Sequence, residues 1–366
     1  MALQKSGIFQ MSKNNIDEFR RKIDNIDNQL VSLFNERAQL AKSIGFLKKN
    51  KKIYRPDREN YIFNKIIKRN EGPLSKESLV FIYTQLISAC RAVEKKLNIS
   101  CLGPQGTFSE EAVVKKFGHS VDIKFCETLD YVFNAVENTT SDYGIVPIEN
   151  TIEGSVGQTL DLLANTKLRI CGEIFLDINQ NFMSLSKNKK LIKKIYSHSQ
   201  SLSQCKNWIQ KKFPNAKKIP VSSNSEAALL ASKNKDSAVI GSINAGKIYG
   251  LKIIEKNIQD YSDNKTRFIL LGHEEISASE SDKTSIVFSS NNKPGSLFKI
   301  LEPLSKKNIN LTKLESRPIK SSNWEYFIYL DLNGHMIDKK VRFCLDSIKS
   351  HTKFFKILGS YPRSIL

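Results

Sequence analysis

The sequence predicts a chain of three differently folded parts: an all-α segment over residues 12–98, an α/β segment over 99–275 and an α+β segment over 282–362. Three patterns indicate this division. The first part spaces its apolar residues at intervals of three and four, the second alternates short apolar runs with small polar turns, and the third has the order βαββαβ. A length of 366 residues suits two or three domains.

The composition argues against several classes of protein. The net charge is +20, but only 12 of the 57 basic residues are arginines, and the lysines are scattered in doublets without interleaved aromatic residues. This pattern favours a solvated lysine-rich surface over nucleic-acid binding. No run reaches the roughly 20 apolar residues of a membrane-spanning helix, and the N-terminus lacks a secretion signal, so a cytoplasmic location is expected.

The six cysteines show no metal-ligand spacing. They are expected to stay reduced, and we predict neither a metal site nor an organic cofactor.

The first segment predicts one long helix followed by two shorter ones. A heptad seam runs from Ile16 to Leu47, which corresponds to a helix of about 50 Å. Two short helices cannot cover such a length, so a partner chain is expected. Further helices are expected from Arg58 to about Asn70 and from about Ser75 to Lys96.

Arg37 interrupts the apolar seam. Its guanidinium stays charged, so it pairs with an internal carboxylate, extends to solvent at the edge of the seam, or faces a pocket for an anionic ligand. Lys48 projects from the same side of the helix as Arg37, whereas Arg20 points about 100° away, toward another helix or protomer. Seven of the twelve arginines lie in this segment, which favours a small polyanion as ligand.

The strings FRRKIDNIDNQLVSLFNERAQLAKSIGFLKKN, YRPDRE and ISACRAVE resemble the AroQ-type chorismate mutases, which are intertwined helical dimers. The resemblance implies that substrate carboxylates are held by Arg37 and by Arg20 of the partner chain. It also implies that Lys48 and Glu94 bracket the ether oxygen, and it places further site residues at Arg58, Glu59 and Cys90.

The implied reaction converts chorismate to prephenate in a pericyclic step. Such a site needs no nucleophile or general base, because it clamps a dianion in a reactive conformation and stabilises charge on the breaking C–O bond. The helical segment contains no histidine, and its Arg/Lys-rich candidates suit this chemistry.

In the middle segment, polar groups follow predicted strands. The turn GPQGTFS precedes a helix over 110–117, which is typical both of an anion site and of an ordinary strand–turn–helix connection. The strand YGIVPI ends in Glu149, Asn150 and Thr151, at the carboxyl end where α/β sheets place ligands.

Five ordered motifs, GPQGTFS, VPIENT, YSHSQ, GSINAGKIYGL and TRF, resemble prephenate dehydratase. The resemblance implies a two-lobed α/β fold similar to type II periplasmic binding proteins. Lobe 1 would comprise about 99–175 and 259–275, and lobe 2 about 176–258. The implied substrate-binding residues are Thr107, Ser109, Glu149, Asn150, Thr151, Ser197, His198, Gln200, Gln204 and Arg267.

The implied reaction removes carbon dioxide and water from prephenate, and Thr266 is the implied donor to the leaving hydroxyl. Arg267 is either a carboxylate clamp or a lobe-stabilising charge. His198 is either a substrate contact or a loop histidine bonded to backbone. Ser199 replaces the proline that is usual in the family, which frees a φ angle and removes no functional group.

The last segment has the ferredoxin-like order, and PGSLFKIL and LESRPI resemble an ACT domain. Paired ACT domains of this kind bind phenylalanine at their interface. The implied effector residues are Gly295, Ser296, Leu297, Glu315, Ser316, Arg317 and Pro318. The family usually has Gly-Ala-Leu-Val where this chain has Gly295-Ser-Leu-Phe298, a change that would narrow an aromatic ligand's pocket.

Together the resemblances imply a bifunctional mutase/dehydratase of phenylalanine biosynthesis. It would act on chorismate and prephenate, with phenylalanine as effector, as a homodimer or larger assembly. The alternative is a non-catalytic ligand sensor with helical dimerisation and ACT domains. Arg37 within its seam, and Thr266 with Arg267 beside the VPIENT strand end, favour the enzyme.

Overall fold

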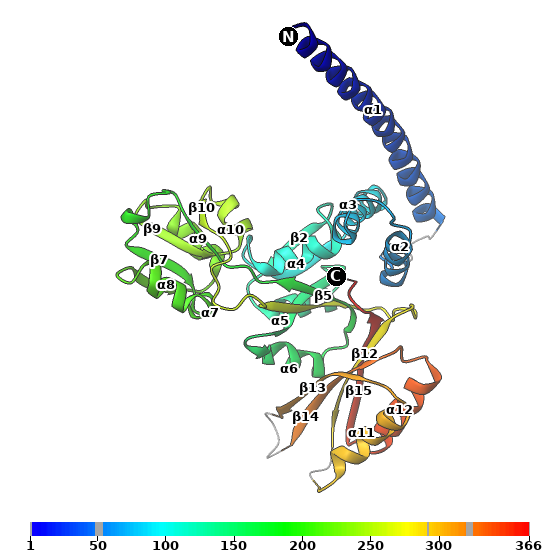
Figure 1. The fold of residues 1–366 in the computed structure, drawn as a ribbon. Coiled ribbons are helices and arrows are strands. Elements are labelled where there is room, and N and C mark those ends of the chain that lie inside the picture. The colour runs from blue at the N-terminus through cyan, green and yellow to red at the C-terminus, as the bar shows by residue number, and fades with distance from the viewer. Residues whose placement is uncertain (1, 48–53, 291–292, 320–324, 366) are drawn as a thin grey trace.

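A computed structural model describes residues 2–47, 54–290, 293–319 and 325–365, with side chains from residue 15 onward. Three folded parts follow one another along the chain (Figure 1). They are a helical unit, an α/β unit with two sheets, and an antiparallel sheet with two helices. The predicted fold class is confirmed.

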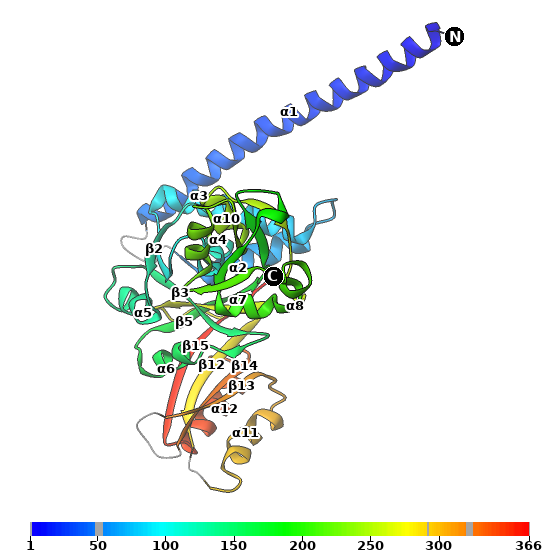
Figure 2. The same cartoon turned by 90° about the vertical axis from the view of Figure 1, so that its left-hand side faces the viewer.

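The helical unit contains α1 (Ala2–Leu47), α2 (Pro56–Lys68) and α3 (Lys76–Glu94). Only the C-terminal end of α1 lies beside α3, and the rest extends away from the body (Figures 1 and 2). The helix starts well before the predicted Ile16. Its seam residues are exposed in the single chain, as at Phe19, Ile23, Ile26, Leu33, Leu40 and Ile44.

The first lobe of the α/β unit is a mixed sheet in the order β2-β1-β3-β11-β5, with β4 paired to β3. Its strands are β1 (Asn98–Leu102), β2 (Asp122–Cys126), β3 (Tyr143–Asn150), β4 (Gly154–Ser155), β5 (Arg169–Asp177) and β11 (Lys265–Gly272). Its helices are α4 (Phe108–Phe117), α5 (Leu129–Glu137) and α6 (Gly157–Asn165). The chain leaves after β5 and returns in β11, which lies between β3 and β5.

The second lobe is a sheet in the order β10-β6-β9-β7-β8. Its strands are β6 (Asn181–Ser184), β7 (Lys194–His198), β8 (Lys217–Val221), β9 (Ser237–Gly241) and β10 (Lys252–Glu255). Its helices are α7 (Ser199–Gln204), α8 (Lys206–Lys212), α9 (Asn224–Ala231) and α10 (Ile243–Ile248), with a 3₁₀ turn at Lys189–Leu191.

The third part is an antiparallel sheet in the order β13-β14-β12-β15. It comprises β12 (Asp282–Ser289), α11 (Ser296–Lys306), β13 (Leu311–Pro318), β14 (Tyr326–Asn333), α12 (Lys339–Ser350) and β15 (Phe354–Pro362). On one face, Ile328 and Leu330 share a core with α11 and α12. On the other, Tyr329 and Tyr361 join the core of the first lobe.

Strand β15 passes very close to β5. A Cβ atom on Gly359 would collide with the carbonyl oxygen of Ile170, so glycine is required there. In the other core cluster of the first lobe, Tyr54 is buried against Phe117 and Tyr143. The first lobe therefore packs against both of the other parts.

None of the six cysteines, all in described positions, forms a disulfide. Within the described ranges, no helix combines the length and the apolar character needed to cross a lipid bilayer.

Candidate functional site

The helical unit brings several candidates together where α1 meets α3. A Cβ atom on Gly45 would collide with the side chain of Glu94, so the two helices touch at this point. Cys90 lies one turn before Glu94 on α3 and is buried. Arg37 is half-buried two turns before Gly45, and no ion pair or hydrogen bond joins it to another described residue. The internal carboxylate expected as one alternative for Arg37 is therefore not found in this part of the chain.

Glu59 lies on α2 and forms a 2.6 Å ion pair with Arg91, a largely buried pair. Burial raises the pKa of Glu59, and the charges of Arg91, Lys116 and Arg37 oppose this rise in part. Arg91 also donates to the carbonyl of Phe117 at the end of α4 (3.0 Å). The α/β unit therefore helps to fix the ion pair between Arg91 and Glu59. Arg58 is exposed and lies over the ring of Tyr61.

Two other mutase candidates lie elsewhere. Arg20 is exposed, pairs with Asp17 at 3.2 Å, and lies about 25 Å along α1 from Arg37 at 1.5 Å per residue. It cannot reach the α1–α3 junction of its own chain. Lys48 lies outside the described residues.

In the α/β unit, Thr266 and Asn150 are paired across β11 and β3. The Oδ1 atom of Asn150 accepts from the backbone N–H groups of Ile152 (2.9 Å) and Glu153 (3.1 Å). This fixes the amide so that its Nδ2 donates to Oγ1 of Thr266 at 2.9 Å. Because the threonine oxygen accepts, its own O–H remains to donate elsewhere.

A chain of amide and hydroxyl groups continues from this pair into the second lobe. Asn150 also donates to Oδ1 of Asn264 (2.7 Å), and Asn264 donates to Gln204 (3.0 Å). Gln180 donates to Gln204 (3.1 Å) and to Ser201 (3.0 Å). The side chain of Thr266 is thus linked through Asn150 and Asn264 to Gln204 of the second lobe, which also donates to Glu153 (3.1 Å).

The other second-lobe candidates stabilise the turn that carries Gln204. The hydroxyl of Ser197 donates to Asn224 (2.9 Å) and to the carbonyl of Ile240 (2.7 Å). His198 caps α7, where its Nδ1 accepts from the backbone N–H of Gln200 (3.3 Å). This is the backbone-bonded alternative expected for His198. Ser199 occupies the first position of α7, where proline also fits well.

The turn before α4 closes against the second lobe. Thr107 caps α4 and donates to the carbonyl of Leu102 (3.1 Å), and Ser109, the second residue of α4, is buried. The carbonyl of Gly106 accepts from Ser242 of the second lobe (2.9 Å). Thr151 is exposed and donates to the carbonyl of Asp263 (2.8 Å). Thr107, Thr151 and Thr266 therefore all lie on segments next to the interlobe contacts.

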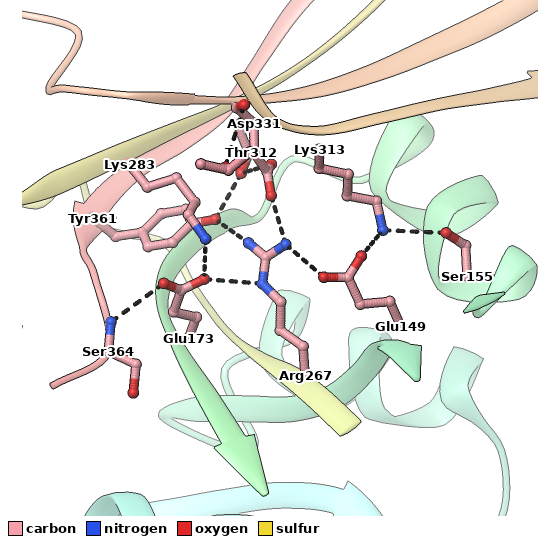
Figure 3. A network of polar contacts seen from close by, with 11 residues as sticks. Glu149, Ser155, Glu173, Arg267, Lys283, Thr312, Lys313, Asp331, Tyr361 and Ser364 are labelled. Atoms are coloured by element: carbon pink, nitrogen blue, oxygen red, sulfur yellow. Dashed lines mark hydrogen bonds and ion pairs between the residues drawn. The ribbon is translucent and has the colours of Figure 1, made fainter. Parts of the chain in front are cut away.

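Glu149 and Arg267 do not join this group. They are paired with each other on the opposite face of β3 and β11, because side chains alternate along a strand. Figure 3 shows both among side chains of the third part. Arg267 lies 2.5 Å from Asp331 and 3.0 Å from the hydroxyl of Tyr361. Of the two alternatives for Arg267, this position matches a structural charge rather than a substrate clamp.

The third-part candidates divide between two places. Gly295 adopts φ +78° just before α11, followed by Ser296 and the partly exposed Leu297. Phe298, at the position where the sequence departs from its family, is exposed.

On edge strand β13, Arg317 and Glu315 share a face, and Arg317 pairs with Asp161 of α6. Ser316 and Pro318 lie on the alternate, more exposed face.

Sequence reasoning missed several residues that the geometry brings to these sites. Arg91 is a guanidinium inside an apolar helix, the same signal that identified Arg37. Asn264 lies two positions before Thr266 in the quoted string NKTRF. Gln180 and Asn224 both donate to Ser201, and they come from segments far apart in sequence, a turn before β6 and the start of α9.

The fold has three parts: a helical unit with Arg37 near the α1–α3 junction, a two-lobed α/β unit with Thr266 near the contacts between its lobes, and a ferredoxin-like module. Family models match in the same order: chorismate mutase type II at 19–95, prephenate dehydratase at 99–276 and the ACT domain at 284–342. The chain belongs to the bifunctional chorismate mutase/prephenate dehydratase family.

Two curated relatives of that name cover nearly the whole chain. The Neisseria gonorrhoeae protein is 43% identical over 95% of this chain and 97% of its own length. The Aquifex aeolicus protein is 42% identical over 96% and 99%. Among solved structures, a prephenate dehydratase from Arthrobacter aurescens in complex with L-Phe is 30% identical, with a TM-score of 0.68 over 73% of this chain and 90% of that one.

Proposed function

We propose that this chain converts chorismate to prephenate in its helical unit and prephenate to phenylpyruvate between the two lobes of its α/β unit. The corresponding domains are residues 12–98, 99–275 and 282–362, and we propose a cytoplasmic enzyme. Family membership favours this enzyme over the ligand-sensor alternative.

The observation that carries the dehydratase half is the donor direction at Thr266. Since Asn150 donates to Oγ1, the Thr266 hydrogen is available to the leaving hydroxyl of prephenate. Loss of that hydroxyl and of carbon dioxide forms an aromatic ring, so a positioned donor is the main requirement of the site. Thr107, Ser109, Thr151, Ser197, His198, Gln200 and Gln204 position the turns around the substrate.

The mutase half is supported by Arg37, which forms no ion pair or hydrogen bond with another described residue and lies two turns before the contact between Gly45 and Glu94. Arg37 binds one substrate carboxylate, and Arg20 of a second copy binds the other, because Arg20 lies too far along α1 to serve its own chain. Lys48 and Glu94 bracket the ether oxygen, and Arg58, Glu59 and Cys90 complete the site. The exposed seam of α1 packs against the second copy.

Phenylalanine is the proposed effector of the third part, by analogy with the Arthrobacter aurescens structure. Leu297 and Phe298 at the start of α11 and Leu314 on edge strand β13 are exposed apolar residues that a second ACT domain would cover. Gly295, Ser296, Glu315, Ser316, Arg317 and Pro318 are the proposed effector residues.

The test assays both reactions on the full chain and on two variants. Thr266→Val keeps the shape of the side chain but removes the donor, and we expect the kcat of phenylpyruvate formation to fall by roughly 10²–10⁴-fold with chorismate consumption unchanged. Arg37→Ala should lower the rate of chorismate consumption and leave the kcat of phenylpyruvate formation unchanged. Each variant therefore controls the folding of the other. Wild-type dehydratase turnover in Thr266→Val would remove the donor assignment.

A further inference from the structure

We propose that Arg267 is a positioning residue, through which the ACT sheet sets the geometry of the donor Thr266. The inference rests on the proposed function of Thr266 and adds to it a physical link to the regulatory part. It concerns the cluster formed by Arg267, Glu149, Glu173, Lys283, Lys313, Asp331 and Tyr361, here called the Arg267 cluster (Figure 3).

The first step is the register of two strands. Thr266 pairs with Asn150, and Arg267 pairs with Glu149, across antiparallel β11 and β3. Directly paired residues share a face and successive residues alternate, so donor and cluster occupy opposite faces of the same two residue pairs. A movement of the Arg267–Glu149 pair therefore displaces the donor pair by way of one peptide unit on each strand.

A β-bulge lies at the same point. The pairing passes from Arg267–Glu149 directly to Phe268–Pro147, which leaves Ile148 as the extra residue. Bulges re-aim side chains and weaken the ladder locally. The bulge loosens only the pairing of β11 with β3, since β11 keeps a regular register with β5 from Lys265 to Leu270. On the β3 side, the position of Asn150 against Thr266 thus depends more on side-chain contacts than it would in a regular ladder.

The second step is the composition of the cluster. Arg267 is 3% exposed. Its guanidinium lies 2.5 Å from Asp331, 2.9 Å from Glu173 and 3.2 Å from Glu149. Three cations (Arg267, Lys283, Lys313) face three carboxylates. Burial opposes the charge on Arg267, but Tyr361 and the carboxylates outweigh it and raise its pKa.

The third step is the origin of these groups. Every strand of the ACT sheet supplies a member of the cluster: Lys283 from β12, Lys313 from β13, Asp331 from β14 and Tyr361 from β15, with Ser285 of β12 bonded to Asp331 and Tyr361. Lys313 contacts Glu149, and Asp331 and Tyr361 contact Arg267 itself. Lys283 contacts Glu173 at 2.7 Å. A rigid shift of this sheet would change all four contacts together, and buried charged contacts respond steeply to such shifts.

The experiment compares two variants on the ACT side of the cluster, Lys313→Met and Asp331→Asn, in the full chain. We expect each to lower the kcat of the dehydratase at least roughly tenfold with KM nearly unchanged, because a misplaced donor acts on the transition state. We also expect the phenylalanine dose–response of each to flatten, and mutase kcat to stay at the wild-type value. Lys313→Arg should restore most of the turnover.

The matched control is Lys356→Met. Lys356 also joins the ACT sheet to the first lobe, but it donates to carbonyls at the end of α6, among them that of Leu163 at 2.8 Å. The Lys356→Met variant should have a lower melting temperature, with dehydratase kcat and the phenylalanine response unchanged. An equal loss of kcat in this control would overturn the inference, because any interface change would then suffice.

Unchanged kcat in both Lys313→Met and Asp331→Asn would also overturn it, and would reduce the cluster to a domain contact. Thr266→Val measured alongside separates this failure from that of the proposed function. If Thr266→Val is inactive while the cluster variants are not, the donor stands and the link falls. If Thr266→Val is fully active, both fall.

Discussion

Thr266 and Arg267 are neighbours in sequence, yet their side chains leave β11 on opposite faces and meet different partners. Thr266 accepts a hydrogen bond from Asn150 beside the second lobe, and Arg267 is enclosed by carboxylates under the ACT sheet. Strand periodicity alone predicts that two successive residues cannot both bind one substrate. The partners of Arg267 could not be predicted, because Asp331 and Tyr361 lie 64 and 94 residues further along the chain.

The carboxyl group of Glu149 leads to a prediction about the pH dependence of stability. Burial works against its ionised form, but the hydrogen bond and charge of Lys313, with the charge of Arg267, outweigh it, so the pKa lies below its usual 4.5. A carboxylate with a lowered pKa stabilises the folded state above the unfolded-state pKa and loses that contribution as pH falls through the folded-state value.

Thermal unfolding of the wild type between pH 7 and pH 3 should therefore show a decline in melting temperature below about pH 4.5. Lys313→Met should make that decline shallower, since it removes the main stabilising partner of the carboxylate. If the melting temperature falls equally steeply with pH in Lys313→Met and in the wild type, the role of this ion pair is contradicted.

At the scale of elements, helix α1 shows what periodicity can and cannot predict. The three-and-four spacing from Ile16 predicted a long helix with an apolar seam, and both are present. Its start at Ala2 was not predicted, because residues 2–15 lack that spacing. The strand and helix order of the last part was also predicted correctly, since each element there carries a clear local pattern and a turn signal.

A charge placed in the seam tests the proposed dimer. Ile23→Glu would bury an unpaired carboxylate against a second copy, so we expect a shift to monomers by light scattering. Chorismate mutase kcat/KM should fall by roughly 10²-fold or more, because Arg20 of the second copy is withdrawn. Dehydratase activity should persist.

Asn28→Glu is the control, since it lies on the face of α1 opposite the seam and adds the same charge. A dimeric Ile23→Glu protein with normal mutase activity would contradict the assignment of the partner.

Across the whole molecule, the first lobe is the part against which the others are packed. Tyr54 inserts its ring beside Phe117 and Tyr143, and Arg91 joins Glu59 of the helical unit to the end of α4. Sequence patterns indicated each part but not these contacts, because docking surfaces between parts carry no periodic signal of their own.

Removing Arg91 tests this docking. Arg91→Met leaves Glu59 buried without its cation, so we expect a loss of about 3 kcal/mol in the free energy of unfolding by denaturant titration. The double variant Arg91→Met/Glu59→Gln should recover part of that loss, because no unpaired charge remains. An unchanged unfolding midpoint in Arg91→Met would show that the helical unit is held by other contacts.

Residues 363–365 contact the helical unit, and this contact has a consequence for folding during synthesis. Asn60 of α2 donates to the carbonyl of Arg363, 303 positions away, and Lys76 of α3 donates to that of Ile365. Both bonds can therefore form only after residues 363–365 have been synthesised. The apolar seam of α1 is exposed before these contacts exist, and exposed apolar surface of this kind favours association with other chains during synthesis.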